Sequence, residues 1–224
     1  MLITGKTGSG KTYLSKFLTR HVKRLVVFDG KGTLGDWQLD PYDKDAVDKI
    51  KRGEDVRTRV LVPFGADPVA WWSGVLSMVY AAGNCTIYID ELYSVCPPNQ
   101  RPSDELWSIY TRGRELGLGV WAATQRPVWV PLFALSEAEH YFMFRLQLEE
   151  DRRRMAAFMS PVVEEPIRDP HGFYYSLSGW DNPRYFRELQ VAPDIQEVQA
   201  KTAIPISTPP EVTRRRKLFS VTGV

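Results

Sequence analysis

The sequence predicts an α/β domain with a mostly parallel central sheet and helices on both faces. Short apolar runs that suit buried strands alternate with longer segments whose apolar residues recur at helical spacing. A glycine-rich turn separates the first of these runs from the first helical segment. Because parallel strands need crossover connections, which are usually helices, this alternation favours parallel pairing.

The first ninety residues contain four short apolar runs that predict strands, at 1–4, 24–29, 58–64 and 85–90. Two segments have apolar residues at helical spacing, at 11–22 and 68–82. The intervening segment 30–53 is polar and interrupted, which predicts a loop with one short helix.

The second half begins with a predicted helix at 103–116, for which Ser103 is a suitable N-cap. Strands are expected at 119–125 and 140–146, followed by a charged helix at 149–159. Two further strands, at 173–176 and 185–190, predict a small antiparallel addition within 160–192. We therefore expect one domain over 1–192 and an extended, proline-rich basic tail over 193–224.

The composition predicts a soluble domain of a reducing, cytoplasmic compartment. With 43% hydrophobic and 25% charged residues, the 224-residue chain can bury one sizeable core. The longest mostly apolar run, 70–83, is shorter than the roughly 20 residues of a membrane span, so no transmembrane segment is expected. Cys85 and Cys96 suggest free thiols. A net charge of +2 neither demands nor excludes a nucleic-acid partner.

The segment after the first strand matches the phosphate-binding pattern G-x-x-x-x-G-K-[ST]. Glycines let the loop turn tightly and aim its N–H groups inward, where the positive end of the next helix also points. Lys11 should reach the β- and γ-phosphates of ATP, and the Thr12 hydroxyl should bind Mg²⁺. An ordinary glycine-rich turn is the alternative. The members of the loop are Gly5, Lys6, Thr7, Gly8, Ser9, Gly10, Lys11 and Thr12.

Two strand ends offer further side chains for chemistry at this loop. Asp90 can reach Mg²⁺, because the carboxyl ends of parallel strands meet at one edge of a sheet. Glu91 can then accept a proton from an attacking water or orient it, and Gln125 can sense the γ-phosphate. The alternatives are a surface Asp-Glu pair that caps the next segment and a strand-terminal glutamine without a role.

Three segments in this order resemble motifs of the FtsK–HerA superfamily of DNA-pumping ATPases: 3–12, 87–91 and 112–127. The third is the most specific, because an Arg-rich helix running into Ala-Thr-Gln-Arg-Pro is uncommon elsewhere. Phe28-Asp-Gly-Lys31 is similar to the acid-x-Lys after the family's second strand. The resemblance covers roughly residues 1–160 and implies a RecA-like P-loop NTPase fold.

The resemblance also implies roles for the site residues. In this family Lys11 and Thr12 would bind phosphate and Mg²⁺, Asp90 would hold Mg²⁺, Glu91 would be the catalytic carboxylate and Gln125 the sensor.

By the same resemblance, the chain should form a ring, hexameric or pentameric, with ATP sites between subunits. An arginine in the helix before the sensor strand would complete the neighbour's site. Arg114 matches best and Arg112 is second, with a solvated helix face as the alternative for both.

In size, the chain resembles the members of one group within the superfamily. Larger members carry N-terminal domains, membrane anchors or a winged-helix DNA reader; with Met1 four residues before Gly5 and a short tail, we expect none of these. The genome-packaging ATPases of tailless, membrane-containing or archaeal viruses are of this size. We therefore expect ATP-driven translocation of double-stranded DNA into a capsid, in the host cytoplasm or associated with the virion. A capsid or portal-vertex protein is the expected docking partner.

Two other functions stay open at this point. One is a P-loop kinase acting on a small molecule; Asp90, Glu91 and Gln125 favour water over such an acceptor. The other is a nucleotide-driven factor for phage assembly or secretion, which the lack of an apolar span disfavours.

Two basic clusters also have two interpretations each. Residues 151–154 could face a central pore and contact phosphates, or form a solvated helix face. Residues 214–217 could bind DNA without sequence preference, or solubilise a disordered tail.

Overall fold

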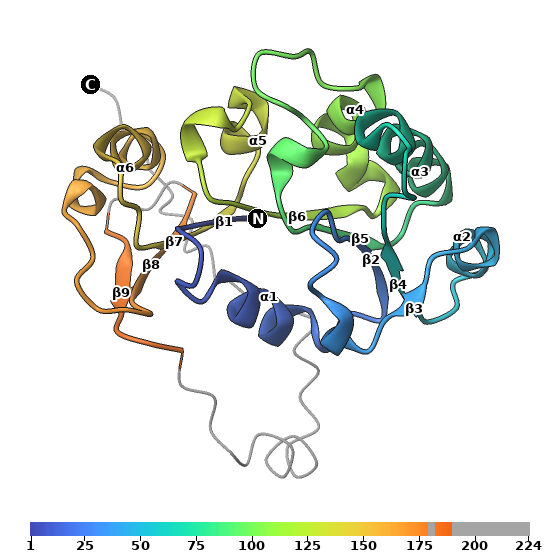
Figure 1. The fold of residues 1–224 in the computed structure, drawn as a ribbon, viewed down its shortest axis with the longest axis horizontal. Helices are drawn as coiled ribbons and strands as arrows, with labels where there is room; N and C mark the ends of the chain where they lie inside the picture. The colour runs from blue at the N-terminus through green and yellow to red at the C-terminus, as the bar shows by residue number, and fades with distance from the viewer. Residues whose placement is uncertain (179–181, 190–224) are drawn as a thin grey trace, which may run out of the picture. The chain divides into compact units, whose positions relative to one another are not determined.

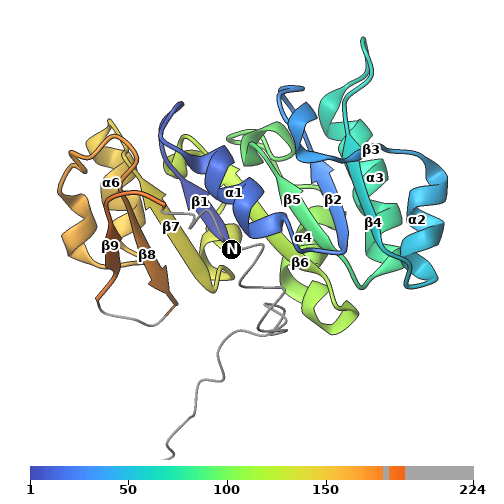
Figure 2. The same cartoon turned by 90° about the horizontal axis from the view of Figure 1, so that it is seen from below.

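The computed structural model describes residues 1–178 and 182–189, which form a nine-stranded sheet with helices on both faces (Figure 1). The strand order is β3-β4-β2-β5-β6-β1-β7-β8-β9 (Figure 2). The first seven strands are β1 (Leu2–Thr4), β2 (Arg24–Phe28), β3 (Asp40–Pro41), β4 (Val56–Val60), β5 (Thr86–Ile89), β6 (Gly119–Thr124) and β7 (His140–Phe144). They are all parallel, whereas β8 (Phe173–Leu177) and β9 (Arg184–Phe186) continue the sheet antiparallel. The predicted fold class is confirmed.

The helices are divided unequally between the two faces. One face carries α1 (Lys11–Thr19) and a short 3₁₀ turn, η1 (Gly35–Trp37). The other carries α2 (Lys44–Lys51), α3 (Pro68–Ala82), α4 (Asp104–Arg112), α5 (Leu132–Ser136) and α6 (Glu149–Ala156). Figure 2 shows α1 in front of the sheet.

The central strands are buried on both faces, which is why they read as continuous apolar runs. In β2, Val26 packs with the cluster under α3, whereas Val27 packs with the cluster under α1, and neither is exposed. In β5, Ile87 and Ile89 face the first cluster and Tyr88 faces the second. This alternation follows from the two-residue period of a strand.

Several predicted bounds differ from the structure. The strand expected at 58–64 is β4, which begins at Val56 and ends at Val60, because Pro63 and Gly65 belong to a turn. The segment 30–53 holds a two-residue strand, β3, beside the predicted short helix. The five-residue helix α5 was missed, since one turn after Pro131 is too short to show a period. The helix expected at 103–116 ends at Arg112 and continues as a 3₁₀ turn, η3 (Gly113–Leu116).

Parallel pairing brings the functional strand ends to one edge of the sheet. Strand β6 lies between β1 and β5, so Gln125 lies between the loop that starts at Gly5 and the acids that follow Ile89. The opposite edge carries the starts of the same strands, including His140 at the start of β7. The starts and the ends of these strands therefore lie at opposite edges of the sheet, although they are close in the sequence.

The described residues belong to one unit, Met1–Leu189. The predicted boundary at 192 stays a prediction, and the basic cluster 214–217 lies outside the described residues. Within the described part, the structure contains no helix long and apolar enough to cross a bilayer.

Candidate nucleotide site

The loop between β1 and α1 has the backbone shape of a phosphate cradle. Gly8 and Gly10 have φ values of 75° and 109°, which favour glycine. At Gly5, with φ of 152°, an added Cβ would lie 2.6 Å from Cβ of Phe144. Gly10 is the N-cap of α1, and no described side chain caps that first turn. The first N–H groups of α1 therefore remain available to an anion.

Lys11 lies under this loop, with 8% of the residue exposed. Its Nζ donates to the carbonyl oxygens of Gly5, at 2.6 Å, and Lys6, at 3.0 Å. Burial lowers the pKa of Lys11 from 10.5 to about 8, although the charge of Glu91 acts in the opposite direction. A buried ammonium that bonds only neutral carbonyls would gain much from an anionic phosphate.

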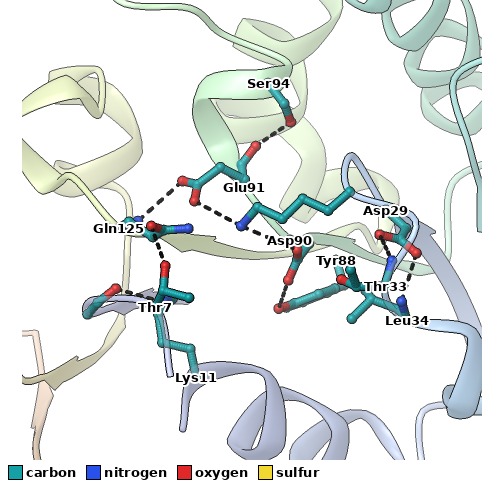
Figure 3. Close-up of polar contacts among 12 residues, drawn as sticks. Thr7, Lys11, Asp29, Thr33, Leu34, Tyr88, Asp90, Glu91, Ser94 and Gln125 are labelled. Atoms are coloured by element: carbon teal, nitrogen blue, oxygen red, sulfur yellow. Dashed lines mark hydrogen bonds and ion pairs between the residues drawn. The ribbon is translucent and has the colours of Figure 1, made fainter. Parts of the chain in front are cut away.

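The two acids follow β5 and are almost fully buried. Asp90 is 6% exposed and accepts a hydrogen bond of 3.3 Å from the Tyr88 hydroxyl (Figure 3). Glu91 is 1% exposed, and its Oε1 accepts from the backbone N–H of Gln125 at 3.3 Å. Burial, the largest cause, raises the pKa of both carboxyl groups.

The second carboxylate oxygen of Glu91, Oε2, has an ion-pair partner but no hydrogen bond, since Nζ of Lys31 lies 3.5 Å away. Oε2 is buried and has no hydrogen-bond partner among the described residues. Such an atom needs an explanation, because buried polar atoms are normally paired. An attacking water fits this position, since a carboxylate oxygen can accept its proton.

Gln125 is connected to the phosphate loop as well as to Glu91. The Thr7 hydroxyl donates to Gln125 Oε1 at 2.8 Å, as Figure 3 shows. The hydrogen bonds of Gln125 thus join the loop after β1 to the acid after β5. This arrangement suits a residue that responds to the γ-phosphate.

The turn after Gln125 is fixed by a buried acid that sequence reasoning did not place there. Asp151, on α6 and 2% exposed, accepts from Arg126 Nε at 2.8 Å and from the Val128 N–H at 3.2 Å. Arg126 also pairs with Glu150 and stacks over Trp129. The Asp151 carboxylate therefore positions the turn rather than facing a pore or solvent.

Two arginines of the predicted basic cluster 151–154 have partners within the chain. Arg152 donates to the backbone carbonyls of Leu146, Gln147 and Glu164, and Arg153 pairs with Glu149. The exposed pair of Arg153 with Glu149 fits the predicted solvated helix face, whereas a pore-facing role for this cluster stays a prediction.

The residues present fit ATP and Mg²⁺. Among the described residues, no group of three or more His, Cys, Asp or Glu could hold a metal alone. Mg²⁺ commonly uses one or two protein ligands together with substrate phosphates, and the Thr12 hydroxyl and Asp90 suit that arrangement. Thr12 also lines a cavity of about 490 Å³ beside α1, with Tyr13, His171 and Leu189 among its walls.

Arg114 does not join this site. It lies in η3, before the start of β6, and its side chain is 94% exposed at 3.6 Å from Glu139. Arg112, in the last turn of α4, is exposed as well. Both arginines precede the amino end of β6, whereas the phosphate loop follows the carboxyl end of β1, so neither is part of the phosphate site of the same chain. Their role toward a neighbour stays a prediction.

Comparison with solved structures shows the same fold in viral ATPases. Genome packaging NTPase B204 from Sulfolobus turreted icosahedral virus 2, in complex with ATP-gammaS, aligns with a TM-score of 0.67 and 17% identity. The alignment covers 84% of this chain and 97% of B204. VirB4 of Thermoanaerobacter pseudethanolicus aligns with a TM-score of 0.61 and 10% identity, over 86% of this chain and 89% of VirB4.

The fold and the phosphate-binding loop are those of a P-loop NTPase, and the chain resembles viral genome-packaging ATPases, as the motifs shared with the FtsK–HerA superfamily led us to expect. The chain is 28% identical over 193 residues to DNA packaging ATPase P9 of Enterobacteria phage PRD1. That match covers 79% of this chain and 82% of P9. No protein-family model matches the chain.

Proposed function

We propose that this chain is an ATP-driven motor that packages double-stranded DNA into a viral capsid. The observation that carries the proposal is the similarity to P9 over most of both chains. The grouping of Lys11, Glu91 and Gln125 at one sheet edge supports ATP hydrolysis as the energy source.

In the proposed reaction each buried group has one task. Lys11 neutralises charge on the β- and γ-phosphates, and the N–H groups of the loop bind their oxygens. Glu91 accepts the proton of the attacking water, and Gln125 orients that water. The Thr12 hydroxyl and Asp90 would hold Mg²⁺, which would neutralise part of the phosphate charge when bound.

We further propose that the motor works as a ring, hexameric or pentameric, with Arg114 completing the neighbour's site. Support comes from the position of Arg114, which is exposed and away from its own Lys11. Contacts to the DNA would be to phosphates and would not depend on sequence. A capsid or portal-vertex protein is the proposed docking partner, in the host cytoplasm or on the virion.

ATPase measurement with random-sequence duplex DNA at two ionic strengths tests this function. We expect the duplex to stimulate hydrolysis at low salt and less at high salt, because phosphate contacts release counterions. Glu91→Gln is the control for contaminating ATPases, since it should bind nucleotide without turning it over. Absence of stimulation at low salt would reject DNA translocation. Phosphate transferred to a small-molecule acceptor would instead identify a kinase.

A further inference from the structure

Lys31 lies beside both acids of the candidate site. Its Nζ is 3.5 Å from Glu91 Oε2 and 3.9 Å from Asp90 Oδ2. Its charge lowers the pKa of both carboxyl groups and so opposes the larger effect of burial. At these distances the contact is an ion pair without close hydrogen bonds, which can be exchanged for a better cation.

The backbone that carries Lys31 is fixed, whereas its side chain is long and 40% exposed. Asp29 accepts hydrogen bonds from the N–H groups of Thr33, at 3.1 Å, and Leu34, at 2.9 Å, which closes the loop after β2. At Gly30 an added Cβ would lie 2.9 Å from the Trp72 ring. Because β2 and β5 are neighbours, this loop holds the lysine next to the acids that follow β5.

The acids need such a cation. Asp90 and Glu91 are almost fully buried, and the charge of Asp29 raises the pKa of Asp90 further. Close carboxylates in a dry site favour protonation unless a positive charge compensates them. Lys11 also lowers both pKa values, but less than Lys31, and its Nζ is held by the carbonyls of the phosphate loop.

We propose that Lys31 is an internal counter-ion of the Asp90–Glu91 pair, and that Mg²⁺ competes with it when ATP binds. The proposal rests on the Mg–ATP site of the proposed function. Before nucleotide binds, the charge of Lys31 lies beside both carboxylates and compensates them. When the divalent ion approaches Asp90, the lysine side chain moves toward solvent, and after product release it returns.

The affinity of a fluorescent, non-hydrolysable ATP analogue, measured in EDTA and in Mg²⁺, tests the competition. The quantity to compare is the ratio of the Kd in EDTA to the Kd in Mg²⁺. We expect Lys31→Met to raise this ratio roughly three- to tenfold, because analogue binding without metal then meets two uncompensated carboxylates and Mg²⁺ meets no competitor. Lys23→Met, which removes a lysine from an exposed pair with Asp55, should leave the ratio unchanged.

An unchanged ratio in Lys31→Met would overturn the competition. Equal weakening of both affinities would also overturn it, since that is the result expected of a direct phosphate ligand. Lys31→Gln repeats the comparison if Lys31→Met does not fold.

Thermal unfolding in EDTA, without nucleotide, tests the counter-ion role separately. We expect Lys31→Met to lower the midpoint by about 2–4 °C, Lys31→Arg to lower it less, and the loss to shrink in a Glu91→Gln background. Equal losses in both backgrounds would reject the role. If the wild-type protein binds no nucleotide, the proposed function fails, and this measurement still decides whether Lys31 compensates the acids.

Discussion

The Thr7 hydroxyl donates a hydrogen bond of 2.8 Å to Oε1 of Gln125, which connects the phosphate loop with the end of β6. Because the backbone N–H of the same glutamine reaches Glu91, one residue is bonded to both sides of the candidate site. The orientation of the Gln125 amide is therefore set by Thr7.

Thr7→Val should slow turnover without abolishing nucleotide binding. The substitution keeps the branched shape and removes a hydrogen bond worth about 1 kcal/mol, so we expect kcat to fall roughly fivefold. Steady-state ATPase and analogue binding measure the two effects. Thr111→Val is the control, since the Thr111 hydroxyl donates to the Trp107 carbonyl on an exposed helix face. A wild-type kcat in Thr7→Val would show that this bond has no part in turnover.

Nucleotide affinity should depend on the charge of Lys11. Burial lowers its pKa to about 8, and phosphate binds only the charged form. Nucleotide therefore raises that pKa, and binding above this pH takes up a proton. We expect the Kd of an ATP analogue to be nearly constant below about pH 8 and to rise above it, by up to about tenfold per pH unit. Calorimetry in two buffers of different ionisation enthalpy measures the proton uptake, and a constant Kd up to about pH 10 contradicts the prediction.

Asp151→Ala should destabilise the fold through the turn after β6. The substitution leaves Arg126 without its buried partner and the Val128 N–H without an acceptor. We expect the free energy of unfolding to fall by about 2–4 kcal/mol, measured by urea denaturation. The control is Glu149→Ala, whose exposed pair with Arg153 should contribute less than about 0.5 kcal/mol. Equal losses in the two variants would mean that the buried contact stabilises the fold no more than the exposed pair does.

Arg114→Ala should bind ATP almost normally and hydrolyse it roughly 10³- to 10⁵-fold more slowly, if its guanidinium stabilises the transferring phosphoryl group of a neighbour. Its exposure and its distance from its own site motivate the experiment. Mixing Arg114→Ala with Glu91→Gln subunits should restore some activity, because some interfaces then pair two intact residues. ATPase is measured across mixing ratios with DNA present. A normal rate in Arg114→Ala alone would show that Arg114 does not complete the neighbour's site. Arg112 or a residue outside this segment would then have that role.

The parts of the site that are encoded locally could be predicted from the sequence. The phosphate loop, the acids after β5 and Gln125 each follow a short apolar strand, and parallel strands bring such ends together without further information. The bounds of α3 were predicted as observed, because Asp67 caps it, Pro68 starts it and Gly83 ends it.

Contacts between distant segments could not be predicted. The burial of Asp151 depends on Arg126, which lies 25 residues earlier and on another element. The nearness of Lys31 to Glu91 depends on which strands are neighbours, and no local pattern gives strand order. The strand β3 has two residues, too few for any period to mark it.

Strand β6 lies between Gln125 and the segment that carries Arg114, and this affects the order in which neighbouring subunits would hydrolyse ATP. It spans Gly119–Thr124, about 20 Å at the usual rise, with Gln125 directly after one end and Arg114 close before the other. The second half of β6 is fully buried, and close-packed interiors transmit strain, so the strand could couple movements near its two ends. If Arg114 serves the neighbour, loss of the γ-phosphate in one subunit would withdraw or advance the arginine in the next. ATP hydrolysis would then proceed sequentially from one subunit to the next in one direction, coupled through β6.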